Sequence, residues 1–448
     1  MQHKIEKLPK SVIKFHITAT KEEVAQFFVR AIEKLAKDLK LPGFRPGKVP
    51  HDMVKDTIGE QAIENEAREL AINDSYFETI NQNKLIPLVR PNDIKINKFS
   101  EEEGLDWEGS VEVLPEIKLN NWKEKLKASK VVGAYSNTPI QADDKEVEET
   151  IKNLQKQFAS LEVKVGNTEK GDWVDVDIDI VEKEKFTPEQ VKKFQAKGFS
   201  LVIGEANFIP GFEDELTDLE KGAEKEFDAT FPKEYMEKSV AGKKVKFKIK
   251  LNEIKKVILA VANDEFAKKF GKENIDDLKK AIKEDLQNRK EQAEKARFED
   301  EAIKEVVKNS EFEVPETLLE QEKEMILERF KHDLEHHKGI GFSEYLASLG
   351  KSKKEVKDGF FEQAENNVKI GLVLGQITKN ENVAVDDKDV EEVMSVDILR
   401  QTTGLDDKSA KEAENRIKER YQDEEFVSSI KNSILARKTI DLIIDQIK

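Results

Sequence analysis

The chain contains no cysteine among its 448 residues. This absence excludes a disulfide framework, a thiolate zinc site and a cysteine nucleophile. It also fits a reducing compartment, so we expect a cytoplasmic protein.

Long apolar runs are missing as well. The first residues, MQHKIEKLPKSVIKF, lack the apolar centre of a signal peptide. No segment approaches the roughly 20 apolar residues that a membrane-spanning helix needs. We therefore expect neither export nor a membrane partner.

Two common catalytic patterns are also absent. There is no G-x-x-x-x-G-K-[ST] loop and no G-x-S-x-G motif, so nucleotide hydrolysis and α/β-hydrolase chemistry lack support. Carboxylate pairs carry no information, because 92 Asp and Glu residues make chance pairs nearly certain. We expect no cofactor.

One pattern resembles a metal site. The segment HDLEHH places His332, Glu335 and His336 in the H-x-x-E-H order of a zinc peptidase. Two histidines four residues apart share a helical face. So short a pattern arises easily by chance in charged helices, and no third ligand stands out downstream. A solvated helix is the ordinary interpretation, and we predict no metal site.

Charge is abundant and unevenly distributed. Charged residues make up 38% of the chain and the net charge is −16, which is typical of soluble proteins with much exposed helix. Residues 1–50 carry eleven Lys or Arg and five Asp or Glu, a net charge of +6, which leaves −22 for the rest. The basic end can bind a polyanion that the rest of the chain repels.

The N-terminal residues predict an α+β domain. SVIKFHIT at 11–18 alternates as a half-buried strand, and Thr20 with Glu23 forms a capping box that starts a helix ending before Pro42. The exposed face of that helix carries a basic stripe of Arg30, Lys34, Lys37 and Lys40. Further helices and a returning strand at LDWEGSVEVLP follow.

The loop after the first helix reads LPGFRPGKVP at 41–50. Loops normally carry polar turn residues, so an exposed Phe44 between Gly43 and Arg45 favours contact with a partner that is anionic and offers an apolar crevice.

The remaining chain divides into a β-rich insert and a helical region. A linker helix is expected at 143–158, and strands at 171–183, 198–204, 225–232 and 243–254. Beyond about residue 260 we expect helices at 263–308, 315–338, 342–349, 352–380 and 386–446, arranged as arms or an open cradle with apolar positions such as Phe360, Phe361, Leu372 and Leu374 lining a groove.

Three motifs give these segments a family resemblance. The loop matches the G-F-R-x-G-K pattern of bacterial trigger factors, ribosome-associated chaperones, through Gly43, Phe44, Arg45, Gly47 and Lys48. IPGFEDEL at 209–216 and TFPKEY at 230–235 are similar to the FKBP-type prolyl isomerase domain of that family. VKIGLVLGQITKNENVAVDDKDVEEVM at 368–394 is similar to its C-terminal arm.

The resemblance implies an elongated, multidomain α+β protein. It assigns residues 1–115 to a ribosome-binding domain, 116–158 to a linker that joins the chaperone body, 159–260 to an FKBP-like domain and 261–448 to an all-α chaperone domain with arms. The implied partners are the large ribosomal subunit near the exit tunnel, through ribosomal protein and RNA, and nascent or unfolded polypeptides. Whether the free protein forms a homodimer stays open.

The resemblance also implies a prolyl-binding pocket. Its residues, carried over by position, are Phe186, Phe208, Ile209, Phe212, Tyr235 and Phe247. The family's D-F-T-G strand reads Asp177-Ile178-Asp179-Ile180 here, so an aromatic wall and a turn glycine are absent, Thr187 replaces an acidic residue, and the segment to Phe199 is longer. A weakened isomerase that still binds apolar peptides is therefore an open alternative.

These observations favour an ATP-independent chaperone for nascent chains with prolyl isomerase activity. A soluble isomerase or holdase that acts away from the ribosome is the alternative, and a zinc peptidase ranks well below both.

Overall fold

The computed structural model describes residues 1–39, 41, 44, 49–129, 141–205, 209–232, 235 and 241–447. The chain forms two compact units. The first comprises Met1–Thr138 and Ala296–Lys448, and the second Pro139–Lys295.

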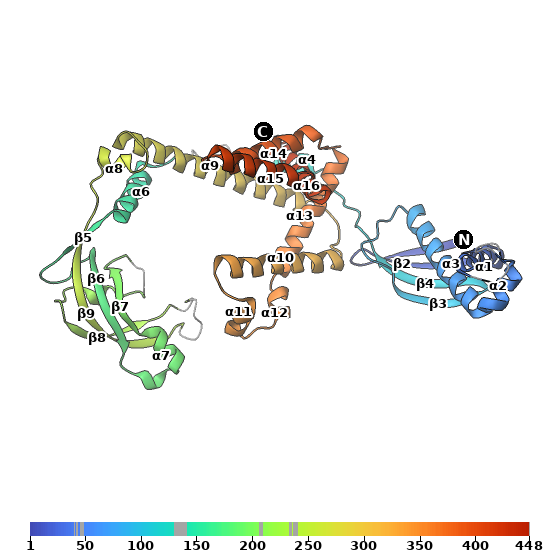
Figure 1. The fold of residues 1–448 in the computed structure, drawn as a ribbon, viewed down its shortest axis with the longest axis horizontal. Helices are drawn as coiled ribbons and strands as arrows, with labels where there is room; N and C mark the ends of the chain where they lie inside the picture. The colour runs from blue at the N-terminus through green and yellow to red at the C-terminus, as the bar shows by residue number, and fades with distance from the viewer. Residues whose placement is uncertain are drawn as a thin grey trace. The chain divides into compact units, whose positions relative to one another are not determined.

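The N-terminal part of the first unit is a four-stranded antiparallel sheet with the order β1-β2-β4-β3 (Figure 1). Its strands are β1 (Gln2–Leu8), β2 (Val12–Ala19), β3 (Asn92–Ser100) and β4 (Gly104–Glu112). Residues of β2 and β4 alternate between buried and accessible positions, because one face of the sheet packs on helices. Those helices are α1 (Lys21–Asp38), α2 (His51–Ile58) and α3 (Glu60–Gln82).

The core of this sheet and its helices is centred on Trp107. The Trp107 side chain is fully buried, its Nε1 donates to Ser75 Oγ at 3.1 Å, and its ring centroid lies 5.1 Å from that of Phe15. The predicted strand at 11–18, the helix after it and the returning strand are confirmed. Both halves of the predicted Thr20 and Glu23 capping box are formed. Strands β1 and β3 were not predicted, because their residues are mostly exposed and polar.

The rest of the first unit is helical. It contains α4 (Trp122–Ala128), the C-terminal end of α9 (Ile275–Lys308), α10 (Glu316–His337), α11 (Phe342–Leu349), α12 (Lys353–Asp358), α13 (Phe361–Asn380), α14 (Asp387–Thr402), α15 (Asp407–Arg420) and α16 (Glu424–Asp445). One core joins α4, α9, α13 and α16 through residues such as Trp122, Phe298, Leu374 and Ile443.

Three of the predicted long helices are wrong in extent. The segment 263–308 is interrupted by Gly271 at φ +69°, and 386–446 by Gly404 at φ +83°, since both glycines adopt left-handed backbone that ends a helix. The segment 352–380 divides at Gly359.

Leu374 was expected to line a groove, but it is buried in the core just described.

The second unit is built on a five-stranded antiparallel sheet with the order β5-β9-β6-β7, in which β8 also pairs with β9 (Figure 1). Its strands are β5 (Ser160–Val163), β6 (Asp172–Ile180), β7 (Ala196–Val202), β8 (Glu224–Thr230) and β9 (Lys244–Ile258). The shorter elements are α6 (Asp144–Gln157), η1 (Lys183–Lys185), α7 (Pro188–Phe194), η2 (Asp214–Leu216) and α8 (Asp264–Lys268).

Four of these strands and the linker helix were predicted, whereas β5 and α7 were not. The mixed α+β class is confirmed. No helix among the described residues is both long and apolar enough to span a membrane.

Candidate functional site

Seven aromatic residues of the second unit form one connected group, which we call the aromatic cluster. Strands β8 and β9 contribute one each, and the others come from the turns and the short helix around the sheet. The members are Phe186, Phe194, Phe212, Phe227, Phe231, Tyr235 and Phe247. Because the rings mostly meet edge to face or tilted, their electrostatic contacts are favourable.

The predicted pocket residues are part of this cluster. The Phe212 and Phe247 ring centroids are 5.4 Å apart at 87°. Ile209 accepts a hydrogen bond from the Phe212 backbone N–H at 2.9 Å, and Phe186 and Tyr235 pack on the same core. The structure therefore brings five of the six candidates together. The sixth, Phe208, lies outside the described residues.

Accessibility divides the five residues into a floor and a rim. Ile209, Phe212 and Phe247 are buried, whereas Phe186 and Tyr235 are only half-buried. This arrangement can desolvate a bound group.

Phe194 is a member of the aromatic cluster that the sequence analysis did not single out. It lies at the end of α7, the helix in the segment that was noted only as longer than usual. The signal was Thr187-Pro188-Glu189-Gln190, a capping box with proline at the first helical position. Thr187 is thus the N-cap of α7.

Ile178 and Ile180 stand where the resemblance led us to expect an aromatic wall and a turn glycine. Both point from β6 into the core and are buried. They fill core volume as aliphatic side chains.

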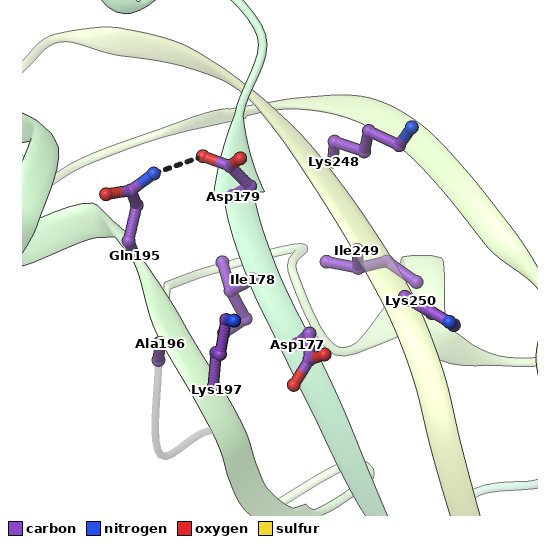
Figure 2. Close-up of a pocket in the computed structure, with 9 residues that line it drawn as sticks. All are labelled: Asp177, Ile178, Asp179, Gln195, Ala196, Lys197, Lys248, Ile249 and Lys250. Atoms are coloured by element: carbon purple, nitrogen blue, oxygen red, sulfur yellow. Dashed lines mark hydrogen bonds between the residues drawn. The ribbon is translucent and has the colours of Figure 1, made fainter.

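The opposite face of β6 borders a shallow groove of about 410 Å³ (Figure 2). Asp177 and Asp179 line it together with lysines of β7 and β9. The backbone N–H of Gly198 and the side chain of Asn252 donate to Asp177 and lower the pKa of its carboxyl. The groove contains none of the predicted pocket side chains, and its acids lie opposite lysines in the strand register, Asp177 opposite Lys250 and Asp179 opposite Lys248.

The histidine pattern lies on α10. The His332 and His336 ring centroids are 4.3 Å apart. Among the residues that the structure describes, no group of three or more His, Cys, Asp or Glu side chains could hold a metal ion. The pattern therefore receives no third ligand from the described part of the chain.

The second candidate site is the loop between α1 and α2. Phe44 is 38% exposed, and its backbone N–H donates to the Leu41 carbonyl at 3.2 Å. Gly43, Arg45, Gly47 and Lys48 lie outside the described residues. The predicted exposure of Phe44 is confirmed.

The basic stripe on α1 is partly neutralised. Arg30 forms an ion pair with Asp74, and Lys34 forms one with Glu66, both acids lying on α3. The predicted exposure of these two residues is confirmed, but their charges are paired, because α3 packs beside α1 and carries acids at matching positions. Lys37 is exposed, and Lys40 lies outside the described residues.

Comparisons with known families match this architecture. The model for the FKBP-type peptidyl-prolyl cis-trans isomerase matches residues 164–252, which include the whole aromatic cluster. The protein thus carries a domain of the FKBP isomerase class. The model for the bacterial trigger factor protein matches residues 1–154, and the model for its C-terminus matches residues 274–445.

Full-length relatives identify the family. The trigger factor of Bacillus cytotoxicus is 32% identical over 417 residues, which cover 90% of this chain and 94% of that protein. That of Caldicellulosiruptor bescii is 30% identical over 452 residues, covering 100% and 97%. The chain therefore belongs to the trigger factor family of chaperones. A solved trigger factor chaperone structure covers 99% of this chain and 100% of that chain, with 20% identity and a TM-score of 0.46.

Proposed function

We propose that this protein is a cytoplasmic, ribosome-associated chaperone that shields nascent chains without ATP and catalyses prolyl isomerisation. Membership of the trigger factor family along the whole chain carries the proposal. We assign residues 1–115 to ribosome docking, 159–260 to isomerisation, and 116–158 with 261–448 to a helical body with arms that holds clients.

Docking is proposed for the loop that contains Phe44. An exposed phenylalanine fills an apolar crevice on a ribosomal protein, while Arg45 and Lys48 pair with acidic side chains or RNA phosphate. Gly43 and Gly47 allow the backbone to approach closely. Lys37 adds an exposed cation near the loop.

Client binding is proposed for the exposed apolar side chains of the helical region. Met325, Phe361, Val396, Leu399 and Leu405 are large and exposed, and Leu399 keeps 68% of its surface accessible. Separate apolar contacts of this kind bind many sequences weakly. Release then needs no nucleotide.

The chaperone proposal is tested by client aggregation. We expect the protein to keep an unfolded client in solution at a small molar excess without ATP. Replacing Val396, Leu399 and Leu405 by serine should lower this protection several-fold. Each substitution removes apolar contact with the client that contributes about 1 kcal/mol or more of binding free energy. Protection that required ATP, or that the triple variant retained in full, would contradict the proposal.

Isomerisation is proposed for the pocket formed by Phe186, Phe208, Ile209, Phe212, Tyr235 and Phe247. A prolyl amide loses resonance and polarity as it twists between cis and trans. A dry aromatic pocket therefore favours the twisted state over the planar one in water.

Tyr235 offers the sharpest test, because it is half-buried at the rim and its removal leaves the floor intact. Tyr235→Ala should lower kcat/KM for exchange of an X-Pro peptide about tenfold, a loss of about 1.4 kcal/mol of transition-state stabilisation. Tyr235→Phe keeps the ring and should retain most of the rate. Exchange at the uncatalysed rate of tens to hundreds of seconds in the unaltered protein would remove the enzyme assignment.

A further inference from the structure

Among the described side chains of helix α7, two apolar ones pack on the core of the second unit. The helix has seven residues, too short to be stable in isolation. Pro188 and Lys192 are exposed, Val191 is half-buried, and Phe194 at the end of the helix is only 6% exposed. The side chains of Val191 and Phe194 therefore hold α7 against the core.

The Phe194 ring lies among the rings of the proposed pocket. Its centroid is 5.2 Å from that of Phe186 at 80°, and 6.4 Å from that of Phe247 at 82°. It is also 5.4 Å from Phe231, which in turn lies 4.9 Å from Tyr235. Phe194 thus contacts the rim residue Phe186 directly, reaches the rim residue Tyr235 through Phe231, and lies against the floor residue Phe247.

The two ends of α7 are fixed by polar contacts that do not involve the core. At the start, the Gln190 backbone N–H donates to Thr187 Oγ1 at 3.3 Å, and the Thr187 backbone N–H donates to Gln190 Oε1 at 3.1 Å. At the other end, the Gln195 side-chain amide donates to Asp179 at 2.7 Å, as Figure 2 shows.

Asp179 is held ionised by its surroundings. Burial raises the pKa of its carboxyl, but hydrogen bonds from Lys183, Gln195 and the Ile180 backbone N–H outweigh this effect, so the pKa lies below its ordinary value. A charged acceptor strengthens the bond from Gln195. The contact between Gln195 and Asp179 therefore acts as a latch at the point where α7 joins β7.

We propose that Phe194 is a built-in occupant of the prolyl-binding pocket, and that a client's X-Pro segment enters by displacing it together with α7. This inference rests on the isomerase activity proposed above. An aromatic ring has the size and apolar character of the prolyl ring that the pocket is proposed to take. Displacement exchanges one apolar contact for another, so clients with a large apolar residue beside proline compete best.

We expect the displacement of α7 to be local. Because Val191 and Phe194 are the apolar attachments of α7 within the core, α7 can leave without disturbing the pairing of β6 with β9. The pocket of the free protein is then closed most of the time, and its apparent affinity for prolyl peptides is lowered by the closed fraction.

The test measures kcat/KM for a short Leu-Pro peptide in full-length variants. Phe194→Ala should raise kcat/KM at least fivefold, mainly through KM, because the competing ring is gone. Gln195→Ala removes the latch alone and should give a smaller rise. Lys192→Ala alters only the exposed side of α7 and is the control expected to match the unaltered protein. Phe194→Ala combined with Tyr235→Ala should lose the gain.

Hydrogen exchange gives a second readout that does not depend on the stability of Phe194→Ala. A saturating prolyl peptide should speed exchange of the α7 amides in the unaltered protein while it slows exchange around Phe247. Slower exchange in α7 would mean that the helix closes over the peptide, and the proposal would be overturned.

The outcomes separate the two proposals. If Tyr235→Ala lowers the rate but a folded Phe194→Ala shows an equal or lower kcat/KM, the isomerase stands and Phe194 is a wall of the pocket, which overturns the displacement. If no variant binds the peptide or speeds the cis-trans exchange of its X-Pro bond, the isomerase proposal fails and Phe194 is an ordinary core residue.

Discussion

Gly104 and Gly59 have similar φ angles but different surroundings. Gly104 has φ +84° at the start of β4, and an added Cβ would lie 2.4 Å from the Ala19 carbonyl oxygen. Gly59 has φ +88° between α2 and α3, with nothing within 4 Å of an added Cβ. The pair therefore separates backbone strain from steric overlap.

We predict that Gly104→Ala destabilises the protein more than Gly59→Ala. Both variants carry the strain of positive φ, about 1–3 kcal/mol. Gly104→Ala must in addition displace the end of β2, at a further cost of about 1–3 kcal/mol. Urea unfolding of the two variants measures the difference, and equal free energies of unfolding would contradict this explanation.

Single residues also show where sequence interpretation reaches its limit. Phe186, Ile209, Phe212, Tyr235 and Phe247 were selected by position, and the fold brings them together because the sheet they surround has the expected strands. Phe194 was missed because it belongs to α7, which lies outside the motifs that carried the resemblance. The partners of Arg30 and Lys34 were missed because ion pairs between helices depend on tertiary packing.

At the scale of elements, α10 and α12 are joined through a buried lysine. The Lys323 side chain is only 7% exposed and pairs with Glu320 on its own helix and with Asp358 at 3.4 Å. Lys357 of α12 contacts Glu320 at 3.0 Å and Glu324 at 3.5 Å. The helices thus share one network of alternating charges.

This network predicts a pH dependence. Hydrogen bonds from Lys323, and then from Lys357, lower the pKa of Glu320 below its ordinary 4.5, while the bond to Glu320 raises the pKa of Lys323 above 10.5. The Glu320 carboxylate therefore stabilises the helix pair fully above pH 4.5, and this stabilisation is lost as the pH falls through its lowered pKa. The Lys323 contribution is full below pH 10.5 and is lost as the pH rises from there through its raised pKa.

Glu320→Gln should therefore weaken the attachment of α12 by about 1 kcal/mol at pH 7. The difference from the unaltered protein should disappear once the pH has fallen below the lowered pKa of Glu320. Hydrogen exchange of the α12 amides, corrected for intrinsic rates, measures the free energy of opening of α12 at pH 7 and in acid for both proteins. Glu328→Gln changes another acid on α10 and serves as the control. A difference that persisted unchanged in acid would contradict the account.

Helix boundaries show the same balance of success and failure. The capping box at Thr20 was read directly from the sequence, because its two residues are close in the chain. The break at Gly404 was missed although glycine was the signal, because helical composition continues on both sides of it. A single left-handed residue outweighs the propensity of its neighbours, and Asp406 then caps α15 by accepting from the Ser409 backbone N–H at 3.1 Å.

At the scale of the whole molecule, the sequence separates charge by region. Residues 1–50 carry a net charge of +6 and the remaining 398 residues carry −22. Since nucleic acid attracts the first and repels the second, binding to a ribosome should be confined to the N-terminal part. Arg30 and Lys34 are paired with acids of α3. The loop cations and Lys37 are therefore the stronger candidates for contact with the ribosome.

Sedimentation with bacterial ribosomes tests the central claim most directly. The unaltered protein is compared, at low and moderate salt, with a Phe44, Arg45 and Lys48 triple-alanine variant. A triple-alanine variant of Phe361, Lys351 and Lys354 is the matched control, since it also removes one exposed phenylalanine and two cations. We predict salt-sensitive binding that the loop variant loses at least tenfold and the control retains. Failure of the unaltered protein to sediment, or equal loss in both variants, would contradict ribosome docking through the loop.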